Sequence, residues 1–171
     1  MRIYNILARL LDYPDAELMS NLPEVIELLK QESDISPQER DSLMQFISWM
    51  QLHELTGMQA DYVQTFDMTP EHDLHLTHHL FGDDRGRGPA LIDLSEHFKS
   101  AGLEVEEGEI PDYLPLILEY VSTLDEMQAS VFLGDAAKVI KVLAENLEKA
   151  ESPYARLLRI VENRAHLAKA A

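Results

Sequence analysis

Apolar side chains recur at helical spacing along almost the whole chain. In the first segment, Ile3, Ile6, Leu7, Leu10 and Leu11 follow the i, i+3, i+4, i+7, i+8 pattern of one helical face. The same pattern returns in later segments, and no segment shows the period of two that a half-buried strand needs. The sequence therefore predicts an all-α fold, a compact bundle-like domain of about seven to nine helices.

Capping and turn signals divide this pattern into separate helices. Ser36, Pro37 and Glu39 form a capping box with proline at the first helical position, and Gly102 stands where a left-handed glycine ends a helix. Helices are therefore expected over 3–11, 23–29, 37–55, 58–66, 70–81, 91–101, 114–124, 136–147 and 154–165.

The chain carries far more acidic than basic side chains. Its 31 Asp and Glu residues against 14 Lys and Arg residues give a formal net charge of −17. Such a chain repels nucleic acid and anionic lipid, so we expect neither as a partner, whereas a basic or apolar peptide is compatible with this charge. The length of 171 residues suits a single domain over 1–171.

The sequence contains no cysteine. Disulfides, cysteine-ligated zinc, iron–sulfur clusters and thiol catalysis are therefore excluded. Residues 1–11 lack the apolar core and cleavage site of a secretory signal, and no apolar run approaches the roughly 20 residues that span a bilayer. We therefore expect a cytoplasmic protein with no direct membrane insertion.

The helical pattern is interrupted within 81–120, which concentrates glycine, proline and charge. A charged turn over 82–89 lacks the Gly-Lys-Ser/Thr of a phosphate-binding loop and follows no strand. Asp84 and Arg87 can pair and hold this turn. Alternatively, Arg85 and Arg87 present forked donors to a carboxylate or to the carbonyls of a partner.

Four histidines lie within 72–79, together with Asp73. On a helix, His75 and His79 would be i,i+4 neighbours, with His72 on nearly the same face, so a transition metal could be held there. The segment lacks the His-Glu-x-x-His pattern of zinc proteases and the recurring Glu-x-x-His pairs of di-iron bundles. We therefore expect a solvated polar face without a metal site, and keep a histidine-dependent metalloprotein as a rival interpretation.

No catalytic constellation stands out in the sequence. A Gly-x-Ser-x-Gly nucleophile motif is missing, and nothing selects a working pair among the 31 carboxylates. We therefore expect no catalytic residues, no cofactor and no enzymatic activity.

The strongest local charge lies in 104–135, which has no Lys or Arg and borders the most apolar predicted helix, 114–124. An apolar groove with an acidic rim would suit a basic amphipathic peptide, whereas a solvated acidic face is the simpler alternative. The acidic residues are Glu104, Glu106, Glu107, Glu109, Asp112, Glu119, Asp125, Glu126 and Asp135. Apolar contacts for such a peptide, or equally a plain core, would come from Tyr62, Phe66, Leu114, Leu118 and Tyr120.

Short motifs in a fixed order connect most of the chain to a known family. In their order and spacing the chain resembles the delta-subunit family of respiratory nitrate reductase, the NarJ-type molybdenum cofactor assembly chaperones among the redox-enzyme maturation chaperones. The motifs are RLLDYPD at 9–15, YVQTFD at 62–67, LFGDDRGRG at 80–88, IDL at 92–94, GL at 102–103, EIPDYLPL at 109–116 and LEY at 118–120.

The resemblance implies an all-helical chaperone without catalytic activity. It implies cytoplasmic binding to the N-terminal segment of the catalytic subunit NarG, which is held in complex with NarH until the molybdenum cofactor is inserted. The family motif Glu-x-Pro-Asp-His corresponds to Glu109, Pro111 and Asp112. Its last position is Tyr113 here, which keeps a ring and a hydrogen-bonding tip.

We therefore predict a groove between the central helices that receives the client peptide as an amphipathic helix, with 83–87 and 109–112 as its two rims. A chaperone that recognises the twin-arginine signal peptide of another molybdoenzyme is the nearest alternative. The residues predicted to bind the peptide are Tyr62, Phe66, Asp83, Arg85, Arg87, Glu109, Pro111, Asp112, Tyr113, Leu114, Leu118 and Tyr120.

Overall fold

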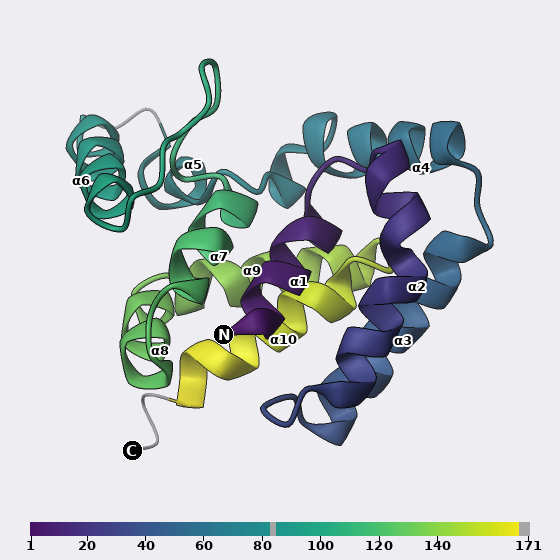
Figure 1. Ribbon diagram of the computed structural model, residues 1–171. Coiled ribbons are helices and arrows are strands. Elements are labelled where there is room, and N and C mark those ends of the chain that lie inside the picture. Colours follow the sequence, from purple (N-terminus) through teal and green to yellow (C-terminus); the bar gives the residue numbers. More distant parts are fainter. Residues whose placement is uncertain (83–84, 168–171) are drawn as a thin grey trace.

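The computed structural model describes residues 1–82 and 85–167, and these residues contain α-helices and no β-strand (Figure 1). Nine of the ten α-helices in this part have seven or more residues, so the all-α prediction and the expected number of helices are confirmed. The helices are α1 (Arg2–Leu11), α2 (Ala16–Gln31), α3 (Pro37–Gln51), α4 (Leu55–Tyr62), α5 (Leu76–Phe81), α6 (Arg87–Ser100), α7 (Leu114–Ser122), α8 (Glu126–Gly134), α9 (Ala137–Lys149) and α10 (Ala155–Leu167), with a π-helix at Val63–Asp67 and a 3-10 turn at Pro70–His72.

The core forms where α1 meets the helices of the C-terminal half. Helix α1 packs mainly against α7, and α10 packs against α9, α8 and α3. Figure 1 shows α1 crossing over α10 near the middle of the molecule. The apolar face expected for the first helix is buried at Ile3, Ile6, Leu7, Leu10 and Leu11. The buried apolar side chains of the described residues form one cluster, although the single-domain assignment itself stays a prediction.

The predicted caps are present. The Glu39 backbone N–H donates to Ser36 Oγ (3.2 Å) and the Ser36 N–H donates to Glu39 Oε2 (3.0 Å), which completes the capping box of α3. Gly102, which follows α6 closely, has φ of +76°, so it adopts the left-handed conformation expected from the sequence.

Several helix boundaries differ from the prediction. Helix α2 begins at Ala16 and not near Pro23, because the Asp15 side chain accepts a hydrogen bond from the Leu18 N–H and caps the helix earlier. Helix α3 ends at Gln51 and not near residue 55. The helix expected over 58–66 consists of α4, which already begins at Leu55, and the π-helix that follows it. The helix expected over 70–81 is a 3-10 turn followed by α5, so His72 is not on one helix with the later histidines.

Helix α6 lies at the edge of the molecule beside α5 (Figure 1). Within α6, which the structure describes in full, only Phe98 is buried. Most residues of the helix are therefore exposed or half-buried, and one of its faces borders an apolar groove.

Candidate functional site

An apolar groove lies between α5, α6, α7 and α8. Its volume is about 710 Å³. Most of its lining is aliphatic or aromatic, and three exposed side chains form its lips: Leu80 of α5 (51% exposed), Met127 of α8 (77%) and Val131 of α8 (60%). The apolar lining residues are Leu76, Leu80, Phe81, Ala90, Leu94, Ile117, Tyr120, Leu124, Met127, Val131, Phe132, Leu133 and Ala136.

The charge of the groove has one sign. Asp93 and Asp135 are the acidic residues among the described lining residues, which include no Lys or Arg. The other polar lining residues are Thr77, His97 and Gln128. The groove thus joins exposed apolar surface to unopposed negative charge, the combination that suits an apolar, basic ligand.

Aromatic rings connect the walls of the groove. The His97 ring of α6 lies 5.9 Å from the Tyr120 ring of α7 and 5.9 Å from the Phe132 ring of α8, measured between ring centroids. Tyr120 and Phe132 also meet edge to face at 5.0 Å. Because α6 has α5 as its main helical neighbour, this ring contact holds α6 toward α7 and α8.

A buried carboxylate ties the α5–α6 wall to the start of α7. Asp112 is fully buried, and its Oδ2 accepts hydrogen bonds from the backbone N–H (3.0 Å) and the hydroxyl of Thr77. Arg87 Nε donates to Thr77 Oγ1 (2.9 Å), and Arg87 Nη2 lies 3.8 Å from Asp112 Oδ2. Since Thr77 lines the groove, these three residues set the position of one groove wall.

Backbone hydrogen bonds support the same junction. The Leu76 N–H donates to the Asp112 carbonyl (3.1 Å), and the Leu114 N–H donates to the Leu74 carbonyl (2.9 Å). These bonds flank the isolated bridge that pairs His75 with Tyr113.

Tyr113 is half-buried, and its side chain is hydrogen-bonded to other residues of the protein. Its hydroxyl donates to Asp12 Oδ1 (3.1 Å) and lies 2.5 Å from the Tyr62 hydroxyl, which donates to the Leu11 carbonyl (2.7 Å). Its ring stacks on His75, with 5.1 Å between centroids. Burial raises the pKa of both tyrosines, so they act as neutral hydrogen-bonding groups.

The histidine segment forms a small polar cluster. Asp73 Oδ1 contacts His75 Nδ1 (2.8 Å), Asp73 Oδ2 lies 3.1 Å from His78 Nδ1, and Glu109 Oε1 lies 3.5 Å from His75 Nε2. The hydrogen bond with Asp73 raises the pKa of His75. Burial acts to raise the pKa of Asp73, but the bonds with His75 outweigh it and lower that pKa. No group of three potential ligands suited to a metal occurs in the described residues.

Of the predicted peptide-binding residues that the structure describes, Tyr120 lines the groove and the others do not. Asp112 is buried, Arg87 is hydrogen-bonded to Thr77, and the described lining of this groove comes from α5, α6, α7, α8 and the turn after α8. The two predicted rims therefore do not coincide with this groove in the described residues, and their role in peptide binding stays a prediction. Asp83, and the proposed pairing of Asp84 with Arg87, lie outside the described residues.

The remaining predicted residues fall into two groups. Phe66, Leu114 and Leu118 are buried in the core together with Tyr62, and Phe66 and Tyr62 pack against Tyr154 with ring centroids 4.9 and 5.9 Å apart. In contrast, Arg85 and Glu109 are exposed and Pro111 is half-buried. A role of any of them in peptide contact stays a prediction.

Helix α8 was not predicted from the sequence, and neither were the groove's most exposed apolar side chains, Met127 and Val131. A usable signal was present at the start of α8. Asp125 caps the helix by accepting from the Gln128 N–H (2.8 Å), and Gln128 Oε1 accepts from the Asp125 N–H (3.3 Å), which is a capping box.

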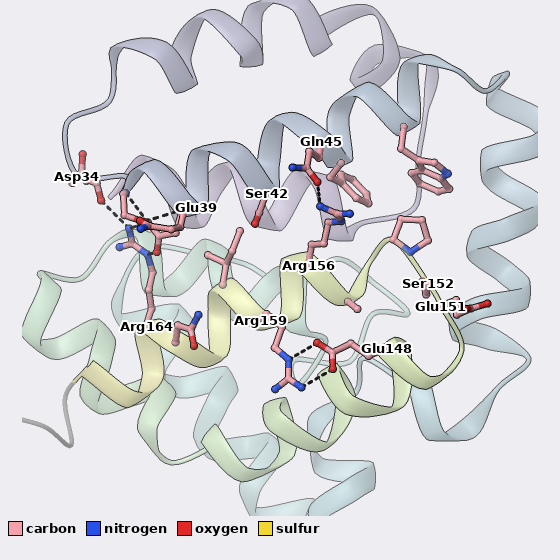
Figure 2. A pocket seen from close by; sticks show the side chains of 18 of the residues that line it. Asp34, Glu39, Ser42, Gln45, Glu148, Glu151, Ser152, Arg156, Arg159 and Arg164 are labelled. Atoms are coloured by element: carbon pink, nitrogen blue, oxygen red, sulfur yellow. Dashed lines mark hydrogen bonds and ion pairs between the residues drawn. The ribbon is translucent and has the colours of Figure 1, made fainter.

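A second, larger hollow of about 1010 Å³ lies between α3 and α10 (Figure 2). Its arginines are already engaged: Arg164 Nε and Nη2 each donate to Glu39 at 2.9 Å, and Arg159 Nε and Nη2 each donate to Glu148 at 2.7 Å. Arg156 bonds to Gln45. The polar residues of this cleft therefore form hydrogen bonds and ion pairs that connect α10 to α3 and α9.

No helix in the described part of the chain is long and apolar enough to cross a membrane.

Comparisons with known proteins agree with the resemblance seen in the sequence. Residues 32–159 match the family model described as the nitrate reductase delta subunit. The chain is 32% identical to the nitrate reductase molybdenum cofactor assembly chaperone NarJ of Escherichia coli K12, over 95% of this chain and 69% of that protein. It is 33% identical to the probable NarJ chaperone of Bacillus subtilis, over 92% of this chain and 85% of that protein.

A further relative is the probable chaperone NarW of Escherichia coli K12, which is 30% identical over 90% of this chain and 64% of its own length. These relatives are assembly chaperones and not enzymes, which confirms the expectation that this chain is not an enzyme. The matched region covers most of the chain, and so the chain belongs to the nitrate reductase delta subunit family of molybdenum cofactor assembly chaperones.

Proposed function

We propose that this chain binds the N-terminal segment of the respiratory nitrate reductase catalytic subunit NarG, folded as an amphipathic helix, in the groove between α5, α6, α7 and α8. The catalytic subunit, in complex with NarH, is held in the cytoplasm in a state competent for molybdenum cofactor insertion and is then released. The observation that carries the proposal is the groove, which has exposed apolar lips, two carboxylates and no Lys or Arg among its described lining residues.

The dimensions of the groove suit a short helix. Its lining on α8 and the following turn runs over 127–136, which at 1.5 Å per residue is about 14 Å, or two to three helical turns. An amphipathic helix of that length presents about three apolar side chains on one face. Burial of those side chains against Leu80, Met127 and Val131 removes apolar surface from water on both partners.

For several residues we propose a role other than the one predicted from the sequence. Tyr120 keeps its proposed contact with the peptide, because its ring lines the groove. Arg87 and Asp112 are proposed to act indirectly, by positioning Thr77 in the groove wall. Tyr62, Phe66, Tyr113, Leu114 and Leu118 are proposed to support the groove from the core.

Isothermal titration calorimetry tests the proposal. The wild-type protein is titrated with a peptide of the first fifteen residues of its nitrate reductase catalytic subunit, and binding at tens of micromolar or tighter is expected. Met127→Ser/Val131→Ser removes two exposed apolar contacts. At about 1 kcal/mol each, their loss weakens binding tenfold or more.

Val142→Ser is the matched control, because Val142 of α9 is also half exposed (50%) but does not line the groove. This variant is expected to bind as the wild type does. Tighter binding of a twin-arginine signal peptide from another molybdoenzyme would favour the alternative client. No heat with the nitrate reductase peptide at these concentrations would contradict the proposal.

A further inference from the structure

Two carboxylates of the groove have no partner among the residues that the structure describes. Asp93 lies on the exposed surface of α6, and Asp135 follows the last residue of α8. Neither carboxylate forms a hydrogen bond or ion pair with the described residues, although every arginine in the α3–α10 cleft has a partner. The two groups come from different helices that border the same apolar surface.

The two carboxylates lie on the two walls that would face the sides of a helix bound in the groove. The lining of α6 runs over 90–97 and that of α8 over 127–136, so the two walls are about 11 and 14 Å long. A helix between the walls turns its apolar stripe toward Ile117, Tyr120 and Phe132, and the residues flanking that stripe face the walls. Side chains at these flanking positions are therefore the ones that meet Asp93 and Asp135.

We infer that Asp93 and Asp135 determine client specificity by pairing with Lys or Arg residues on the two borders of the client helix's apolar stripe. The inference rests on the proposed function and adds a sequence rule for the client. The client segment has two to three helical turns, apolar residues at i, i+3 or i+4 and i+7, and basic residues on both flanks of that stripe. Asp or Glu on a flank is disfavoured, because a like charge would face an unpaired carboxylate.

The effect of local ion pairs with Asp93 and Asp135 must be separated from the electrostatic attraction that the net charge of the whole chain exerts. With a net charge of −17, any basic peptide is drawn to the protein at low ionic strength. Glu24 of α2 and Asp41 of α3 are exposed, do not line the groove and have no partner among the described residues. Their substitution by lysine changes the net charge as much as substitution of Asp93 and Asp135 does, so it serves as the control.

The test is a charge-reversal experiment with two peptides. One is the fifteen-residue N-terminal peptide of the catalytic subunit, and the other has Glu in place of each Lys or Arg that flanks the apolar stripe. Asp93→Asn and Asp135→Asn are each expected to weaken binding of the basic peptide about two- to fivefold, as for exposed ion pairs. Asp93→Lys/Asp135→Lys is expected to prefer the Glu peptide, whereas Glu24→Lys/Asp41→Lys keeps the wild-type preference. Circular dichroism melting checks that each variant is folded.

Three results would count against the inference. One such result is that Asp93→Lys/Asp135→Lys keeps the wild-type preference while Met127→Ser/Val131→Ser loses affinity. The groove would then bind the client, but the two carboxylates would not determine which peptide is preferred. If the control lysine variant changes preference equally, net charge alone accounts for the selectivity. If the wild-type protein binds neither peptide, the proposed function fails together with the inference.

Discussion

Asp112 offers the sharpest test of how the groove wall is held. Its side chain is fully buried just before α7. Its Oδ2 accepts two hydrogen bonds from Thr77, one from the backbone N–H and one from the hydroxyl. Arg87 approaches the same oxygen to 3.8 Å. We therefore consider two substitutions, Asp112→Ala and Asp112→Asn, which differ in whether Thr77 keeps an acceptor.

The magnitudes follow from the number and type of these bonds. A hydrogen bond to a charged acceptor contributes about 1.5–3 kcal/mol. Asp112→Ala removes both bonds and leaves the Thr77 N–H without a partner, so the free energy of unfolding should fall by about 3–5 kcal/mol. Asp112→Asn keeps an acceptor oxygen, and because neutral bonds are about half as strong, we expect a loss of about 1.5–2.5 kcal/mol.

Urea unfolding followed by far-ultraviolet circular dichroism measures both values. Asp41→Ala is the control, since Asp41 is exposed and has no partner among the described residues; its effect should stay within about 0.5 kcal/mol. The reasoning would be refuted if Asp112→Ala cost less than about 1 kcal/mol, or if the Asn variant were as unstable as the Ala variant.

Three further predictions concern stability. Glu39→Gln removes the charge that Arg164 binds through two 2.9 Å bonds, so unfolding should become easier by about 1.5–3 kcal/mol, and a loss below 0.5 kcal/mol would contradict this. Since Asp73 raises the pKa of His75 while its own pKa is lowered, their contact stabilises the fold between about pH 4 and 6.5 and loses its effect as the pH rises through the raised pKa of His75. His75→Gln should therefore cost about 0.5–1 kcal/mol at pH 5.5 and less at pH 8.5; equal losses would exclude this contact as the cause. Gly102→Ala, at φ of +76° with open space around the position, should lower the thermal stability by about 1–2 kcal/mol through backbone strain alone, whereas an unchanged melting temperature would argue against a left-handed residue there.

Much of the fold could be predicted because most helices have a continuous buried stripe. In α9, for example, Val139, Ile140, Leu143 and Leu147 are all buried, so periodicity alone identified the helix. Helix α8 lacks such a stripe. Its buried face consists of Ala129, Ser130 and Leu133, whereas the large apolar side chains of Met127 and Val131 are exposed.

The candidate site was only partly predictable, because burial depends on residues distant in the sequence. Of the residues singled out in the sequence, Asp135 of the acidic stretch and Tyr120 line the groove. The sequence could not show that the buried Asp112 accepts hydrogen bonds from Thr77, which is 35 residues away in the chain. Nor could it show that α5, α6, α7 and α8 meet around one groove, since that follows from tertiary packing alone.

The central claim is that the client segment lies in this groove. Site-specific photo-crosslinking tests it most directly, with a photoreactive residue placed at Val131 in the groove or at the similarly exposed Val142 outside it. The protein is mixed with the complex of the catalytic subunit and NarH before cofactor insertion, and crosslinked peptides are identified by mass spectrometry. We predict crosslinks from position 131 to the N-terminal segment of the catalytic subunit and none to that segment from position 142. Equal crosslinking from both positions, or crosslinks to that segment from position 142 alone, would contradict the claim.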